Sequence, residues 1–214
     1  ESLEEIILPQ SLEVLGDSAM EGATALKELV LPAGVHTLEY DSLYNCKSMT
    51  SLTMSENLSE GSVNNNMLGS CNALTTIIVP AGVQFVPENF AQHGSVKEFV
   101  VEEGNSKYFS QDGVLYGYDE EGRQILISYP KAKEDTTYTV LEGTVEIGQD
   151  AFRSRESIEE IILPEGLEVI RQDGFAYCKA LKKMELPASV TTIEYDAFYG
   201  CSSITSLAIP KSVT

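Results

Sequence analysis

The chain has 214 residues, of which 33 are acidic and 14 are basic, and its formal net charge is −19. Such a charge repels phosphate backbones and anionic lipid headgroups at long range, so the composition argues against nucleic acid as a partner. No stretch approaches the ~20 apolar residues needed to cross a bilayer, so we expect no direct insertion into a membrane.

A short motif, usually closed by a proline, recurs nine times along the chain. Its closing residues are, in order, Pro9, Pro32, Ser55, Pro80, Glu102, Leu141, Pro164, Pro187 and Pro210. In front of each, two apolar residues flank one outward residue, which is the period of a strand with one buried face. Proline then ends the strand because it has no N–H to donate. Since most steps are 23 residues long, the pattern predicts a solenoid in which each repeat forms one turn, called a rung below.

A second apolar set follows each closing residue. Its members include Leu15, Met20 and Ala23; Leu38, Leu43 and Cys46; Ile170, Phe175 and Cys178; and Ile193, Phe198 and Cys201. We expect this set to close each rung from its other side. Units of this length leave little room for helices, so we predict a right-handed solenoid with a curved parallel sheet of short strands and a mostly irregular or 3₁₀ convex side.

The repeats occupy residues 1–101 and 138–214, and an insertion lies at about 102–137. Two β-prone runs, at 113–118 and 124–129, are joined by a short segment that contains a glycine, which predicts a β-hairpin. If this hairpin lies beside the solenoid, the whole chain is a single domain, 1–214.

Three tyrosines of the insertion, Tyr116, Tyr118 and Tyr129, are candidates for binding a partner. They either cover the end of the neighbouring core or form a projecting recognition surface, because tyrosine offers a large contact area at a low entropic cost.

The segment "LKKMELPASVTTIEYDAFYGCSS", from Leu181 to Ser203, resembles the unit "LxxIxLPxxVxxIxxxAFxxCxx" of the BspA-like (TpLRR class) leucine-rich repeats of bacterial surface proteins. The resemblance covers essentially the whole chain and implies a β-rich, horseshoe-like leucine-rich-repeat solenoid. It also implies an extracellular binding or adhesion module of a cell-surface or secreted protein, with a protein or glycan ligand on host or neighbouring cells. The alternative is a structural spacer that carries another domain.

The stretch from Glu1 to Cys46 returns as the stretch from Glu156 to Cys201, a shift of 155 residues. Two similar arms therefore flank the insertion. Because the chain begins within one motif and ends just after another, we expect it to be a piece of a longer protein.

All four cysteines lie in one column, meaning the same position in successive rungs. They are Cys46, Cys71, Cys178 and Cys201, and the column holds Ala23, His93 and Arg155 in other rungs. The cysteines are either buried free thiols or bridges between neighbouring rungs, pairing 46 with 71 and 178 with 201. Spacings typical of a zinc site do not occur.

Nothing in the sequence marks a catalytic centre. His36 and His93 are the only histidines, and neither lies in a nucleophile or metal motif. We therefore predict a protein that is not an enzyme and that has no cofactor and no metal site.

The outward strand position is the better candidate for a functional site. Alternation places it on the concave face of the sheet, where the candidate partner-binding residues are Ile7, Val30, Thr53, Ile78, Val100, Ile162 and Glu185. An acidic column that includes Glu5, Glu28 and Glu98 lies beside it. An exposed apolar strip with a charged rim often marks a partner surface. Alternatively, these β-branched residues are there because they favour strands and pack against one another.

Overall fold

The computed structural model describes residues 2–64 and 66–214. The chain forms two compact units, Glu1–Gly113 and Val114–Thr214, called unit 1 and unit 2 below. The boundary between them falls inside the predicted insertion. Each unit is a stack of solenoid rungs. The single domain 1–214 stays a prediction.

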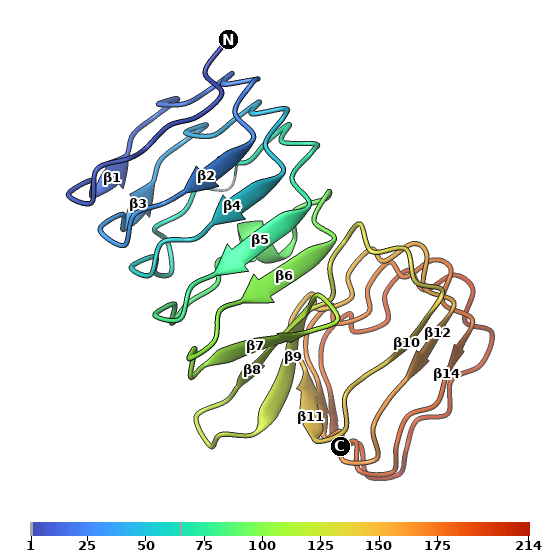
Figure 1. The fold of residues 1–214 in the computed structure, drawn as a ribbon. Helices are drawn as coiled ribbons and strands as arrows, with labels where there is room; N and C mark the ends of the chain where they lie inside the picture. The colour runs from blue at the N-terminus through green and yellow to red at the C-terminus, as the bar shows by residue number, and fades with distance from the viewer. Residues whose placement is uncertain (1, 65) are drawn as a thin grey trace. The chain divides into compact units, whose positions relative to one another are not determined.

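The main sheet of unit 1 is a parallel ladder of four short strands (Figure 1). They are, in order across the sheet, β2 (Glu28–Val30), β4 (Ser51–Thr53), β5 (Thr76–Val79) and β6 (Glu98–Val101). The register pairs Leu29 with Leu52, Leu52 with Ile77, and Ile77 with Phe99, all of which are buried. The strands stay in register although the repeat lengths differ here, so the connections absorb the extra residues.

A second, shorter ladder closes the rungs of unit 1. It consists of β1 (Val14–Leu15) and β3 (Thr37–Leu38), and Leu38 forms an isolated parallel bridge with Val63. The second apolar set therefore faces the core, as predicted. One short helix, α1 (Glu88–Ala91), and the strand β7 (Tyr108–Gln111) complete the unit.

The connections between strands are irregular chains of turns. The predicted alternative, 3₁₀ helix, does not occur among residues 2–64 and 66–214. Several turns need a positive φ at a non-glycine residue, and Asp150, Asp173 and Asp196 supply it at 23-residue intervals with φ of 55–56°. Aspartate tolerates this left-handed conformation better than most residues, but the 3₁₀ repeat requires negative φ throughout.

Unit 2 also has two ladders. One contains β10 (Thr137–Thr139), β12 (Glu160–Ile162) and β14 (Lys183–Met184). The other contains β8 (Val114–Tyr118), β9 (Gln124–Ser128), β11 (Thr144–Ile147), β13 (Val169–Ile170) and β15 (Thr192–Ile193). Strands β8 and β9 are antiparallel, which confirms the inserted hairpin, and β9 then pairs in parallel with β11. The hairpin thus extends the solenoid ladder of unit 2 by two strands, β9 and then β8.

Stacked aromatic rings run through the core of unit 2. The centroids of Tyr129 and Phe152 are 5.3 Å apart, those of Phe152 and Phe175 are 5.2 Å apart, and those of Phe175 and Phe198 are 5.4 Å apart. The interplanar angles fall from 24° to 6° along this series. Each ring comes from the next rung, so the repeat length itself brings the rings into register.

All four cysteines are free thiols, and each Sγ donates to a backbone carbonyl of the preceding rung. The Sγ–O distances are 3.4 Å for Cys46 to Met20, 3.1 Å for Cys71 to Leu43, 2.9 Å for Cys178 to Phe152 and 3.0 Å for Cys201 to Phe175. Where the column holds arginine, Arg155 Nε donates to the Tyr129 carbonyl at 2.6 Å instead. Cysteine and arginine in this column therefore each supply a hydrogen to a backbone carbonyl, whereas Ala23, in the same column, has no side-chain donor.

Candidate protein-binding surface

In unit 1, the outward face of the main sheet carries an apolar column of Val30, Thr53, Ile78 and Val100. Strand pairing places Val30 opposite Thr53, Thr53 opposite Ile78, and Ile78 opposite Val100. Val30 is 63% exposed and Val100 is 41% exposed, while the two middle residues are half-buried. This face is therefore an accessible, largely apolar strip that crosses four rungs.

A polar column lies two residues before the apolar column on the same face and comprises Glu28, Ser51, Thr76 and Glu98. The same register aligns its members. Thr76 Oγ1 donates to Glu98 Oε1 at 3.0 Å, and both glutamates are exposed. The predicted pairing of an apolar stripe with an acidic one is thus present in this sheet.

Ile7, which the sequence assigns to the apolar column, is 88% exposed. It lies in an irregular segment before β1. Ile7 therefore stays a candidate for the partner-binding surface.

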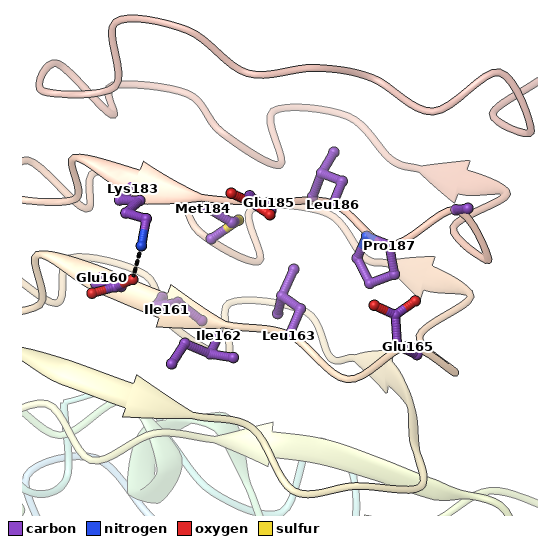
Figure 2. A pocket seen from close by; sticks show the side chains of 11 residues that line it. Glu160, Ile161, Ile162, Leu163, Glu165, Lys183, Met184, Glu185, Leu186 and Pro187 are labelled. Atoms are coloured by element: carbon purple, nitrogen blue, oxygen red, sulfur yellow. Dashed lines mark hydrogen bonds and ion pairs between the residues drawn. The ribbon is translucent and has the colours of Figure 1, made fainter.

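A hollow of about 550 Å³ lies between β12 and β14 of unit 2, lined by side chains of the outward face and by the buried Ile161 and Met184 (Figure 2). Ile162, 46% exposed, and Glu185, also exposed, are the two predicted site residues on this face. Both line the hollow, together with Leu163 and Pro187. The apolar column is therefore shorter here and is interrupted by a charge.

On the outward face of unit 2, a lysine balances the charge of a glutamate on the neighbouring strand. Lys183 Nζ lies 2.6 Å from Glu160 Oε1 of the neighbouring strand, as the dashed line in Figure 2 marks. This carboxylate holds the pKa of Lys183 above its usual value. The 23-residue spacing between Glu160 and Lys183 was the signal in the sequence that could have predicted this pair.

Similar ion pairs between rungs recur elsewhere in unit 2. Lys182 Nζ lies 2.8 Å from Glu159 Oε1. Arg171 bridges two carboxylates, with its Nη2 at 2.7 Å from Glu146 and its Nη1 at 2.8 Å from Glu194. The hydrogen bonds to Glu146 and Glu194 raise the pKa of the guanidinium, and Arg171 in turn lowers the pKa of Glu194. Most basic groups of this unit are thus already engaged with its own acids.

The hairpin tyrosines do not form a projecting surface as a group. Tyr116 and Tyr129 are fully buried, so they are removed from the candidate partner-binding residues. Tyr129 donates to Asp135 at 2.7 Å, and burial raises the pKa of its phenol. The hydroxyls of Tyr116 and Tyr138 are 2.7 Å apart. Only Tyr118 of the three is exposed, at 39%, and it stays a candidate.

Both histidines lie within hydrogen-bond distance of neighbouring protein groups. His93 Nε2 lies 3.1 Å from the Leu68 carbonyl, in the column that cysteine occupies elsewhere, and His36 Nδ1 lies 3.0 Å from Thr37 Oγ1. Among the described residues, no helix is long and apolar enough to span a membrane.

The repeat pattern and the two-ladder rung correspond to a known family. Residues 1–112 and 136–214 match the BspA type leucine rich repeat region in six copies. The chain belongs to this family. The unmatched stretch between them contains β8 and β9, so the hairpin is an addition to the BspA-type repeats.

Several solved structures resemble this chain over most of its length. The pneumococcal vaccine antigen PcpA is 30% identical with a TM-score of 0.72, and the match covers 94% of this chain and 49% of that one. This chain thus spans about half the length of the PcpA structure. No curated protein matches the sequence.

Two more distant structures share the fold alone. A leucine rich cell surface protein from Faecalibacterium prausnitzii A2-165 is 20% identical with a TM-score of 0.56, covering 96% of this chain and 73% of that one. A leucine-rich repeat protein from Eubacterium ventriosum ATCC 27560 is 13% identical with a TM-score of 0.59, and the match covers 92% of this chain and 70% of that one.

Proposed function

We propose that this chain is a non-catalytic protein-binding module of a bacterial cell-surface or secreted protein and that it acts in adhesion. The observation that carries the proposal is the exposed apolar column on the outward face of the unit 1 sheet. The apolar side chains on this face point to solvent and add nothing to the packing of the core. Contiguous apolar surface on a protein often marks an interaction site.

The relatives support the same assignment. Leucine-rich repeats commonly serve as scaffolds that bind proteins, and the similar solved structures include a vaccine antigen and a cell-surface protein by their own descriptions. The partner in this proposal is a protein or glycan on host or neighbouring cells. The formal charge of −19 disfavours nucleic acid in that role.

The test is binding of the full chain to a panel of extracellular matrix proteins and host-cell glycans, measured by biolayer interferometry. Replacing Ile7, Val30 and Ile78 with serine is expected to weaken binding to the partner that the wild type recognises. Val14→Ser is the matched control, because Val14 is also exposed but lies on the other ladder. Circular dichroism checks that each variant stays folded.

Equal binding by the triple variant and the wild type would remove the sheet face from the proposal. A panel with no bound member would instead favour the structural spacer.

A further inference from the structure

The two units differ in how their charges are balanced. Residues 1–113 contain 16 acidic and four basic side chains, whereas residues 114–214 contain 17 acidic and ten basic side chains. All four arginines lie in the second group. Unit 1 therefore carries a formal charge of −12, and unit 2 carries −7.

The ion pairs follow the same division. In the described part of unit 1, His36 Nε2 lies 3.9 Å from Glu13 Oε2, and no lysine of that part lies within ion-pair distance of Glu28 or Glu98. On the corresponding face of unit 2, Lys183 neutralises Glu160. The polar column of unit 1 is thus the one that still offers carboxylates to a partner.

Resting on the proposed function, we propose that the outward face of the unit 1 sheet binds a basic amphipathic helix of its partner. Apolar side chains of the helix would lie along the apolar column, and lysines or arginines on its flank would pair with Glu28 and Glu98. A second copy of this chain is a poor occupant because both copies carry the same strong negative charge.

The spacing of the columns favours a helix over an extended peptide. Neighbouring strands lie about 4.8 Å apart, so the apolar column offers one contact per ~4.8 Å along the solenoid. A helix presents one face with a repeat of ~5.4 Å, and an extended strand presents one with a repeat of ~6.8 Å. Over the three steps from Val30 to Val100, the mismatch is ~2 Å for a helix and ~6 Å for a strand.

The separation of the columns fits the same geometry. Glu28 and Val30 are two residues apart in β2, so the polar and apolar columns run parallel at a distance of ~6.8 Å. A helix about 10 Å wide covers both columns at once. Lys27 and Lys97 are exposed one residue before β2 and β6, outside the two columns, so they do not occupy this surface.

The probe is an 18-residue blocked peptide with leucine at helical spacing on one face, lysine on the flank and alanine elsewhere. Fluorescence anisotropy with the full chain is expected to show saturable binding that weakens when the salt is raised from about 0.1 M to about 1 M, where the screening length falls to ~3 Å. A peptide with glutamate in place of lysine is expected not to bind.

The decisive comparison uses two variants with the same change in net charge. Glu28→Lys with Glu98→Lys is expected to weaken the lysine peptide at least tenfold. Glu21→Lys with Glu60→Lys changes exposed acids away from the sheet face and is expected to stay within twofold of the wild type. A peptide carrying two central prolines, which cannot form the helix, is expected to bind at least tenfold more weakly.

Equal losses in the two double variants would show attraction to net charge alone and would overturn the inference. So would equal binding of the proline peptide, or no binding of the lysine peptide. None of these results would touch the proposed function, because the serine variants and the matrix panel test that separately.

Discussion

The stacked rings of unit 2 lead to a stability prediction for Phe175. This ring is fully buried and has a stacked neighbour on each side, at 5.2 Å and 5.4 Å. Truncating a buried phenylalanine to alanine costs about 3–5 kcal/mol, and each aromatic pair adds ~0.5–1.5 kcal/mol beyond area burial. We expect Phe175→Ala to lower the free energy of unfolding of unit 2 by about 4–5 kcal/mol.

Phe198 provides the matched control. It occupies the same column one rung later, but it is partly exposed and stacks on one ring, Phe175. Phe198→Ala should cost about half as much, ~2 kcal/mol, because less surface is lost and one ring pair is removed. Urea denaturation followed by far-UV circular dichroism measures both values by linear extrapolation. Equal losses in the two variants, or a loss below ~1 kcal/mol for Phe175→Ala, would refute the continuous ring stack as a source of stability.

Two further predictions concern titratable groups of unit 2. Burial raises the pKa of Cys178 to about 12, whereas Cys201 is only partly buried, so we expect iodoacetamide at pH 8 to alkylate Cys201 first and Cys178 only after unfolding, as peptide mass spectrometry would show. Arg171 lowers the pKa of Glu194, so this carboxylate stabilises the folded chain above its unfolded pKa and less as pH falls through its folded pKa. At neutral pH, Glu194→Gln should lower the free energy of unfolding on the order of 1 kcal/mol, because the pair is partly exposed. Urea denaturation at a series of pH values should show this difference from the wild type disappear in acid, and a difference that persists at low pH would contradict the role of the ion pair.

The sequence predicted the strands and the hairpin because both have local signatures. Alternation before a closing proline locates β2 and β12, and a glycine-containing turn locates the hairpin. The 25- and 22-residue steps around Pro80 did not reveal which residues pair, because a repeat length says nothing about whether extra residues enter the strand or the connection. In the structure, Thr76 pairs with both Ser51 and Glu98, so the differences in repeat length lie in the connections and not in the strands.

The candidate site was predicted in outline and missed in detail. Tyr129 was grouped with the hairpin because of its neighbours in sequence, although it stands 23 residues before Phe152 and belongs to the ring stack. The exposed strand position was visible from alternation. Neutralisation of Glu160 by Lys183 depends on how two long side chains meet across rungs, which alternation along a single strand does not show.

The internal duplication explains how one fold can carry two different surfaces. Side chains that face the core must fit the rungs above and below, so the leucines, isoleucines and cysteines recur between the arms. Outward side chains meet no such requirement, and the 155-residue shift sets Glu28 and Val30 of the first arm against Lys183 and Glu185 of the second. If both arms arose from one ancestral array, their difference in charge lies at the positions that folding leaves free. Substitutions at such positions can change recognition without loss of the solenoid, so we expect the two sheet faces to differ in what they bind.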